Sequence, residues 1–491
     1  MHAEKPSSPT TIAPEEVDVV IVGGGLSGIG AAVHLQQKCP GKRYVLLESR
    51  DALGGTWDLF RYPGIRSDSD MHTLGFSFNP WPDAKAIADG PAIKRYINDT
   101  ADKFSVTPHI RLSHSVTQAF WSDETQRWTI TVQHGSNTLQ FIAQFLFMGS
   151  GYYNYNAGHN PLFPNESDFK GEIIHPQFWP EELDYRDKTM VIIGSGATAV
   201  TLVPTLAKTA KHVTMLQRSP TYIVARPGKD RIANLLKSLL SDTLAYKITR
   251  KKNIWLSRFF NSRIQKNPGK AKKFLLKLTR KELPKGIDIK HFTPDYMPWD
   301  QRICLAPDGD FFSALRDGSA SIVTDDIESF SSNGISLKSG HTLEADIIVK
   351  ATGLELVTGG HVDIRVNNEP IHFGETVSYK GVMFSGVPNF VLVFGYTMAS
   401  WTLKADLAAL YFCRMINHLD RTGYSMACPP RPPQDLQIKP LLSFNSGYVQ
   451  RAAAKLPKQG DRPPWVVHQD YLADRQVLLN EEIPDGVMVF K

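Results

Sequence analysis

The stretch that decides the fold is Val17-Asp-Val-Val-Ile-Val-Gly-Gly-Gly-Leu-Ser-Gly28. Its apolar half, residues 17–22, is typical of a buried strand, and it leads directly into a G-x-G-x-x-G pattern. A helix is expected over residues 27–37 and a second strand over residues 44–48. This order of strand, glycine loop, helix and strand predicts a Rossmann-like unit that binds a dinucleotide.

The residues at the key positions of this unit each have a physical role. Gly23 permits the tight turn, Gly25 lets the backbone approach a pyrophosphate, and Gly28 allows the helix to pack closely on the strand. Ser27 lies in the first helical turn, where N–H groups and the helix dipole attract anions. Glu48 follows Gly28 by about 20 residues, the position of a carboxylate that binds ribose hydroxyls. Because Glu48 would repel a 2′-phosphate, this unit favours FAD or NAD over NADP.

A second unit of the same kind begins with the strand expected at residues 189–193. It continues with Gly194-Ser-Gly-Ala-Thr-Ala199, a helix over residues 197–206 and a strand over residues 212–217. Arg218 follows that strand where an acid would select NADH, and its guanidinium can bind a 2′-phosphate in bidentate fashion. The pattern therefore favours NADPH. The residues expected at this second site are Gly194, Ser195, Gly196, Ala197, Thr198, Ala199, Val200, Gln217 and Arg218.

Four further motifs surround these units. They are Gly54-Gly-Thr-Trp57, Arg61-Tyr-Pro-Gly-Ile-Arg-Ser-Asp68, Phe169-Lys-Gly-Glu-Ile-Ile-His-Pro-Gln-Phe-Trp-Pro180 and Pro298-Trp-Asp-Gln-Arg302. The third has the form F-x-G-x-x-x-H-x-x-x-W-P. On these motifs the chain is identified as a member of the Baeyer–Villiger monooxygenase family, the class B flavoprotein monooxygenases. It most resembles the mycobacterial branch that activates the thioamide prodrug ethionamide.

The resemblance implies a set of residues around FAD and a catalytic pair. The further residues expected at the flavin are Gly55, Thr56, Trp57, Asp58, Leu59, Arg66, Ser67, Asp68 and Val116. Arg302 would stabilise negative charge on the activated oxygen, and Asp68 would orient it. Gln301 stands where many members have a lysine that holds the 2′-phosphate. His175 is expected to serve a linker between domains, and Trp465 is a candidate contact of the nicotinamide cofactor.

The expected fold class is α/β, with two Rossmann-like domains, one for FAD and one for NADP. The expected boundaries are a disordered tail at 1–15, the first part of the FAD-binding domain at 16–154, the NADP-binding domain at 155–345 with a helical excursion at about 225–300, and the second part of the FAD-binding domain with the C-terminal segment at 346–491. The apolar runs at residues 145–151 and 346–353 are expected to be strands that return the chain to the FAD-binding domain.

The charge of the chain is uneven. The formal net charge is +6, yet between Lys247 and Lys285 basic residues recur with a single acid, Glu282, among apolar residues at helical spacing. A solvated helical surface would explain this pattern, and attraction to anionic lipid or to cofactor phosphates is the alternative. No nucleic-acid-binding module accompanies the charge, so no nucleic acid partner is expected.

The cysteines and the hydropathy indicate the compartment. Four scattered cysteines show no metal-ligand spacing, which is typical of free thiols in a reducing cytoplasm and predicts no metal site. No apolar run reaches the length of about 18 residues that a spanning helix needs. The expected location is therefore the cytoplasm, either free or peripheral at the inner face of the cell membrane.

The resemblance implies a flavoprotein monooxygenase that uses NADPH and inserts one oxygen atom of O2 next to a ketone carbonyl, through a C4a-peroxyflavin, to give an ester or lactone. The same chemistry implies oxidation of sulfur in sulfides and in thioamides such as ethionamide. One alternative is a flavin-dependent N- or S-monooxygenase, whose fingerprint normally lacks Trp179-Pro180. Another is a membrane-docked nucleotide-binding flavoprotein without an oxygenase role. The expected partners are O2 and a small ketone, sulfide or thioamide.

Overall fold

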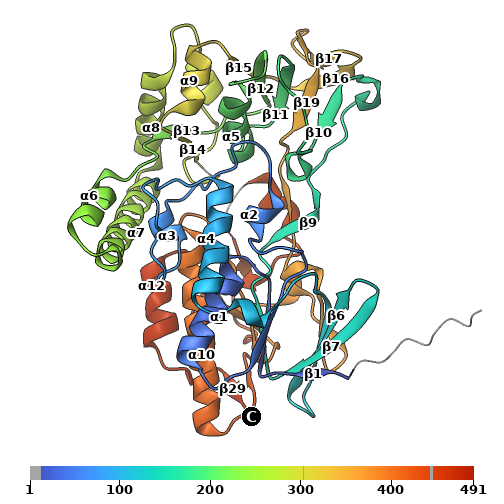
Figure 1. Cartoon of the computed structure of the whole chain (residues 1–491), viewed down its shortest axis with the longest axis vertical. Helices are drawn as coiled ribbons and strands as arrows, with labels where there is room; N and C mark the ends of the chain where they lie inside the picture. Colours follow the sequence, from blue (N-terminus) through green and yellow to red (C-terminus); the bar gives the residue numbers. More distant parts are fainter. Residues whose placement is uncertain (1–12, 302, 443–445) are drawn as a thin grey trace, which may run out of the picture.

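Two five-stranded parallel sheets organise the molecule, one behind each glycine motif (Figure 1). The computed structural model describes residues 13–301, 303–442 and 446–491. The first sheet has the strand order β25-β8-β2-β3-β4. Its strands are β2 (Val19–Val22), β3 (Tyr44–Leu47), β4 (Ile110–Arg111), β8 (Phe145–Met148) and β25 (Phe390–Leu392). The α/β fold class is confirmed.

The central strand β2 explains the layers around the first sheet. Val19 and Ile21 point into a core shared with the helices α1 (Leu26–Lys38) and α10 (Trp401–Thr422). Val20 and Val22 point to the opposite face. That face is covered by a six-stranded sheet built around β5 (Ser115–Ser122), β6 (Arg127–His134) and β7 (Asn137–Ala143). Because both faces of β2 are buried, its sequence is continuously apolar.

The second sheet repeats this plan with the order β10-β19-β11-β12-β15. Met190 and Ile192 of its central strand pack toward α5 (Ala197–Leu206) and α9 (Asp310–Arg316), whereas Val191 and Ile193 face a small antiparallel sheet, β16-β17-β18. The strands of the second sheet are β10 (Glu172–Ile174), β11 (Thr189–Ile193), β12 (His212–Gln217), β15 (Ala320–Thr324) and β19 (Ile347–Lys350). The small sheet comprises β16 (Ile327–Ser331), β17 (Gly334–Leu337) and β18 (Thr342–Glu344).

Two expectations about the course of the chain are wrong. The run 346–353 does not return to the first sheet, because β19 pairs in parallel with β10 and β11 of the second. An apolar parallel strand has the same sequence signature in either sheet, so the pattern could not decide between them. The return begins later, where β20 (Leu354–Leu356) pairs with β9 (Tyr153–Gly158). The expected tail is also too long, because Glu15 belongs to β1 (Glu15–Glu16), which pairs with β7.

A helical excursion projects from the second sheet and packs on the first domain (Figure 1). Its elements are β13 (Ile223–Arg226), α6 (Arg231–Leu239), α7 (Asp242–Lys266), α8 (Pro268–Glu282) and β14 (Cys304–Pro307). Arg250 on α7 is buried and donates to the carbonyl oxygens of His72 at 3.0 Å, Thr73 at 3.2 Å and Gly75 at 2.7 Å, and to Asp406 at 3.2 Å. The excursion is therefore anchored in the domain that carries the first glycine loop.

Candidate active site

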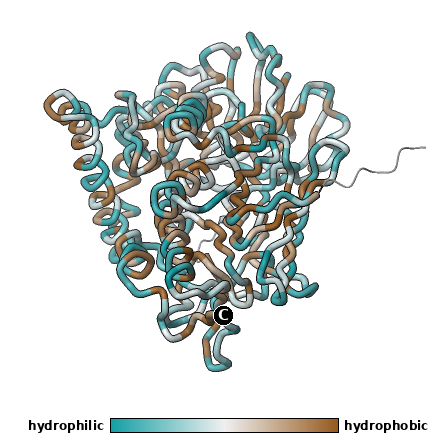
Figure 2. The backbone as a smooth tube through the Cα atoms, turned by 60° about the horizontal axis from the view of Figure 1, so that its bottom comes forward, coloured by the Kyte–Doolittle hydropathy of each residue, from teal (hydrophilic) through white to brown (hydrophobic). Residues whose placement is uncertain are grey.

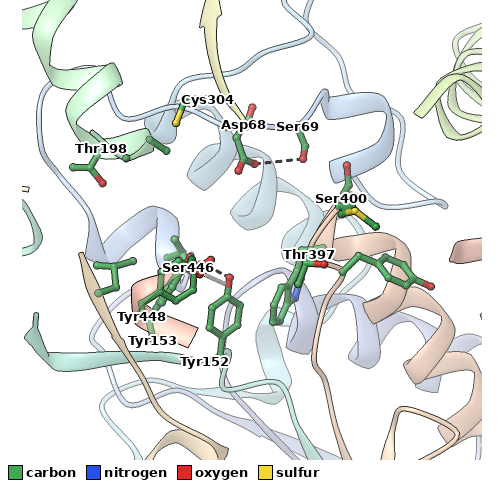
Figure 3. Close-up of a pocket in the computed structure, with 18 of the residues that line it drawn as sticks. Asp68, Ser69, Tyr152, Tyr153, Thr198, Cys304, Thr397, Ser400, Ser446 and Tyr448 are labelled. Atoms are coloured by element: carbon green, nitrogen blue, oxygen red, sulfur yellow. Dashed lines mark hydrogen bonds between the residues drawn. The ribbon is translucent and has the colours of Figure 1, made fainter. Parts of the chain in front are cut away.

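One cleft of about 2590 Å³ brings both glycine loops together. Each loop follows the carboxyl end of the central strand of its sheet, which is where parallel α/β sheets place their ligand sites. Figure 3 shows side chains that surround the open space. Those labelled on its upper side are Asp68, Ser69, Thr198 and Cys304, and those labelled below and to the right include Tyr152, Tyr153, Thr397 and Ser400.

Two glycines of the first loop stand where no larger residue would fit. Gly23 has φ +104°, and a Cβ there would lie 2.6 Å from the carbonyl oxygen of Gly149. A Cβ on Gly28 would lie 1.8 Å from the carbonyl oxygen of Gly23. A Cβ on Gly25, in contrast, would have its nearest neighbour, the backbone of Gly55, at 3.5 Å, and Gly25 borders the cleft. Helix α1 begins directly after Gly25, so its N-terminal N–H groups are available to an anion in the cleft.

Glu48 is held in place at the end of β3, beside this loop. Its Oε2 accepts the N–H of Gly24 at 2.5 Å, and its Oε1 accepts the N–H of Arg50 at 2.9 Å. The residue is buried and lines the cleft. A carboxylate fixed at the end of the second strand suits the hydroxyls of a ribose.

The predicted cofactor residues divide into two groups. Those that line the cleft are Gly23, Gly25, Ser27, Glu48, Gly55, Thr56, Trp57, Arg66, Ser67, Asp68, Val116, Gly194, Ser195, Gly196, Ala197, Thr198 and Arg218. Those that do not line it, as far as the described residues define it, are Gly28, Asp58, Leu59, Ala199, Val200 and Gln217. The residues of the second group remain predicted cofactor residues, and the structure shows what surrounds each of them.

Asp58 is turned into the protein, where three cations surround it. Its carboxylate is fully buried and lies 2.6 Å from Nε of Arg50, 2.5 Å from Nζ of Lys94 and 3.5 Å from Nη2 of Arg61. Burial works to raise the pKa of Asp58, but the bonds to Lys94 and Arg50 outweigh it and hold the pKa below its usual range. The side chain of Leu59 is buried in a small apolar cluster. Both side chains are therefore directed into the protein.

The other residues of this group are closely packed. Gly28 presses against Gly23, and Ala199 and Val200 face the core under α5. Gln217 is buried at the end of β12, where its amide donates to the carbonyl oxygen of His291 at 2.7 Å and to Thr324 at 2.8 Å. Position in a glycine motif therefore does not by itself place a side chain in the cleft.

The second loop presents an open anion site. Gly194 has φ +137°, and a Cβ there would lie 2.3 Å from the carbonyl oxygen of Ala351. No atom of the described residues lies within 4 Å of a Cβ built on Gly196, so space remains above the start of α5. Ser195 donates to the carbonyl oxygen of Ser219 at 3.1 Å. Arg218 is exposed at the rim of the cleft, directly after β12.

The loop with Asp68 joins the two halves of the cleft. Arg66 forms an ion pair with Asp310 in the first turn of α9, through Nη1 and Oδ2. The N–H of Ser67 donates to the carbonyl oxygen of Ala88 at 2.9 Å. Burial raises the pKa of Tyr62, beside Thr198, to about 12. Asp68 accepts a long hydrogen bond from Ser69 at 3.4 Å and lines the cleft (Figure 3).

The predicted catalytic arginine, Arg302, lies outside the described residues. Its neighbours Trp299 and Gln301 line the cleft. Trp299 has φ +74°, an outlier for a bulky residue, and such strain is concentrated at functional sites.

His175 of the F-x-G-x-x-x-H motif stands at the junction of the domains. Its Nδ1 accepts the N–H of Gln177 at 3.2 Å, and its ring fills the space beside Gly158, where a Cβ would lie 2.1 Å from its Cε1. Burial lowers the pKa of His175, which favours the neutral ring. Trp179 is buried in the core of the second domain.

One candidate is misplaced and several cleft residues were missed. Trp465 is buried in the first domain against Tyr379, away from the described lining of the cleft. Trp401 instead lines the cleft, and its Nε1 donates to Ser27 at 2.8 Å. Tyr152 and Trp401, with ring centroids 4.9 Å apart, also line the cleft.

Comparison with known proteins defines the class. A model of an NAD(P)-binding Rossmann-like domain matches residues 21–90. The chain is 50% identical over 478 residues to the FAD-containing monooxygenase EthA of Mycobacterium tuberculosis (strain ATCC 25618 / H37Rv), covering 97% of this chain and 98% of that protein. It is 47% identical over 479 residues to the probable FAD-binding monooxygenase AlmA of Acinetobacter baylyi (strain ATCC 33305 / BD413 / ADP1), covering 97% and 96%.

Solved structures show the same fold. An open structure of cyclohexanone monooxygenase has a TM-score of 0.75 at 21% identity, covering 97% of this chain and 100% of that one. An oxidised steroid monooxygenase bound to NADP also has a TM-score of 0.75, at 20% identity and with coverage of 97% and 99%. The fold and site are those of a flavin monooxygenase. With half of its residues shared with EthA over nearly the whole length, the chain belongs to the Baeyer–Villiger family of class B flavoprotein monooxygenases.

Proposed function

We propose that this enzyme uses FAD and NADPH to insert one oxygen atom of O2 next to the carbonyl of a small ketone, giving an ester or lactone, and that it also oxidises sulfur in sulfides and thioamides. The observation that carries the proposal is that two nucleotide loops open onto one cleft, with the Asp68 loop between them. Two adjacent nucleotide sites suit hydride transfer from one cofactor to the other.

The residues present fit FAD in the first half of the cleft. The start of α1 offers N–H groups to a pyrophosphate, and the glycine backbone of Gly25 and Gly55 leaves a shallow wall on which it can lie. Glu48 is fixed for the adjacent ribose, and Val116 borders the same groove. Ser27 and Trp401 are joined by a hydrogen bond beside the start of α1.

The residues present fit NADPH in the second half. The start of α5 and the open space over Gly196 would take its pyrophosphate. Arg218 would bind the 2′-phosphate through charge-assisted hydrogen bonds. Gln301, which lines the cleft in place of the family's lysine, leaves this recognition to Arg218.

Bound FAD, reduced by NADPH, would supply the oxygen-activating chemistry. The protein orients the cofactors, excludes water and places fixed charge at the reacting atoms. Arg302 would stabilise negative charge that develops on oxygen during insertion, without reorganisation. Asp68 would orient that guanidinium, and the Arg66–Asp310 ion pair would hold the Asp68 loop against the second domain.

Arg302→Ala tests these roles. The variant should retain its flavin and be reduced by NADPH, yet ester formation should fall about 100-fold, as when one electrostatic stabiliser is removed. Ester formation by Asp68→Ala should also fall, but by a smaller factor. Near wild-type ester formation by Arg302→Ala would exclude this role. Turnover of sulfides and amines with no ester from any ketone would favour a heteroatom monooxygenase instead.

We also propose peripheral contact with an anionic membrane surface. Residues 231–285 contain 16 Lys and Arg and 2 Asp and Glu, a formal charge of +14, whereas the whole chain carries +6. The remainder therefore carries −8, and the positive excess belongs entirely to this segment. Basic clusters on helices are attracted to anionic headgroups within about a Debye length, roughly 8–10 Å at ordinary ionic strength.

A further inference from the structure

Helices α7 and α8 expose large aromatic side chains among these charges. Trp255 is 61% exposed, Phe260 55% and Phe274 58%, and Phe259 is 39% exposed. We call these four residues the aromatic wall. At the left edge of Figure 2, where the excursion lies, brown apolar segments alternate with teal polar ones along the helices. Surface aromatics gathered in this way differ from the singly scattered apolar residues of an ordinary surface.

The exposure of the aromatic wall follows from how α7 is anchored. Arg250 and Asn253 face the first domain, where Asn253 donates to Asp70 at 2.9 Å. Trp255 and Phe259 are one turn apart on another face of the helix, and their rings stack with centroids 5.4 Å apart. The guanidinium of Arg263, a further turn on, lies 4.8 Å from the centroid of Phe259. Arg263 thus adds a positive charge at the end of the row formed by Trp255 and Phe259.

The aromatic wall is part of the cleft that holds the nucleotide loops. All four of its residues line that cleft together with Met398, Ser400 and Trp401. The wall is also tied to the opposite side, because Asn261 donates to the carbonyl oxygen of Met398 at 2.9 Å and Arg258 pairs with Asp470 at 2.6 Å. The aromatic wall therefore lies in the same cleft as the start of α10 and the first glycine loop.

We infer that the aromatic wall is a membrane-facing entrance, through which an apolar substrate dissolved in an anionic bilayer reaches the cleft. This inference rests on the proposed oxygenase function and on the membrane contact proposed above. No helix within residues 13–301, 303–442 and 446–491 has both the length and the apolar character to span a bilayer, so the contact would be interfacial.

Charge and exposed aromatic side chains both favour a lipid surface as the partner of the aromatic wall. Exposed Lys251, Arg263, Lys270, Lys273 and Lys277 accompany the aromatic residues on the same two helices. Aromatic rings inserted at the level of headgroups, with lysine and arginine among anionic lipids, are the two components of interfacial binding. A substrate that enters from the bilayer avoids transfer through water, which is costly for an apolar molecule.

The first arm of the test measures binding without turnover. The holoenzyme is sedimented with phosphatidylglycerol-containing vesicles and with pure phosphatidylcholine vesicles, at low and high salt. The variant Trp255→Gln/Phe259→Gln is compared with Ile438→Gln, which removes an apolar residue that is 50% exposed and is not part of the described lining of the cleft. We expect binding to the anionic vesicles only, lost at high salt, and weakened about tenfold in the double variant because less apolar surface is buried. Equal binding by all three proteins would overturn the inference.

The second arm measures access to the cleft. The kcat/KM value for a long-chain methyl ketone carried in anionic vesicles is divided by that for acetone in water. This ratio should fall about tenfold in the double variant, in proportion to the weaker vesicle binding, and should be unchanged in Ile438→Gln. An unchanged ratio in the double variant would contradict the entrance.

The remaining outcomes separate the claims. If the wild type binds anionic vesicles but forms no product from any ketone or sulfide, the proposed oxygenase function fails and the membrane contact stands. A further outcome is that the wild type does not bind vesicles but self-associates, and that Trp255→Gln/Phe259→Gln abolishes this association. The aromatic wall would then be an interface between two copies of the chain, and the inference would be wrong.

Discussion

Replacement of Arg218 by alanine tests how the second site selects its cofactor. Arg218 follows β12 directly, borders the cleft and is exposed. Gln217, the neighbouring candidate, is buried with its amide directed at His291 and Thr324, so its side chain cannot share the recognition of the 2′-phosphate. Of these two neighbouring candidates, only Arg218 is placed to make the proposed charge-assisted contact.

The expected size of the effect on KM follows from the exposure of Arg218. A hydrogen bond to a charged group contributes about 1.5–3 kcal/mol, and solvent screening at an exposed residue favours the lower end. A loss of about 1.4 kcal/mol corresponds to about a tenfold change. Arg218→Ala should thus raise the KM for NADPH about tenfold and leave the KM for NADH nearly unchanged.

Steady-state oxidation of NADPH and NADH with a saturating ketone measures this directly. Arg231→Ala, which removes an exposed arginine at the start of α6, is the matched control and should leave both KM values unchanged. Equal losses for NADPH and NADH in Arg218→Ala would show that Arg218 does not bind the 2′-phosphate.

Four further substitutions test the scaffold. Gly28→Ala should abolish folding or flavin retention because its Cβ would lie 1.8 Å from a carbonyl oxygen, whereas Gly25→Ala, with 3.5 Å available, should fold and lose flavin affinity in a fluorescence titration. Asp58→Asn should destabilise the protein by about 1.5–3 kcal/mol in urea unfolding at neutral pH, because it weakens the charge-assisted hydrogen bonds of a buried carboxylate with the partly exposed Arg50 and Lys94. Since the pKa of Asp58 is lowered on folding, the difference from wild type should shrink as the pH falls below about 4. Gly158→Ala should lose activity because its Cβ would meet His175, and addition of His175→Ala should restore part of it.

The glycine units are the part of the fold that sequence predicts best. The strand at Thr189–Ile193, the helix at Ala197–Leu206 and the strand at His212–Gln217 have the predicted bounds. Within one such unit, local rules of turn and packing decide the structure. The prediction of the sheet to which β19 belongs was wrong, because strand pairing between distant segments leaves no local signal.

The candidate site was predicted only in part, because contacts between distant segments leave no local signal there either. Backbone positions of the glycine loops are set by the motif, so they lie at the cleft as expected. The direction of a side chain depends on partners far along the chain, and Asp58 faces Lys94 instead of the cleft for this reason. The contact of Trp401 with Ser27 and the burial of Arg250 against Asp406 join residues far apart in sequence, which periodicity cannot reveal.

The central claim is that the two nucleotide sites cooperate to place one oxygen atom of O2 into a ketone. Incubation of the FAD-loaded enzyme with NADPH, a methyl ketone and isotopically labelled O2, followed by mass spectrometry of the product, tests it most directly. The account predicts an ester that contains one labelled oxygen atom, with one NADPH consumed for each ester formed. Consumption of NADPH with only hydrogen peroxide as product, or an ester without label, would contradict it.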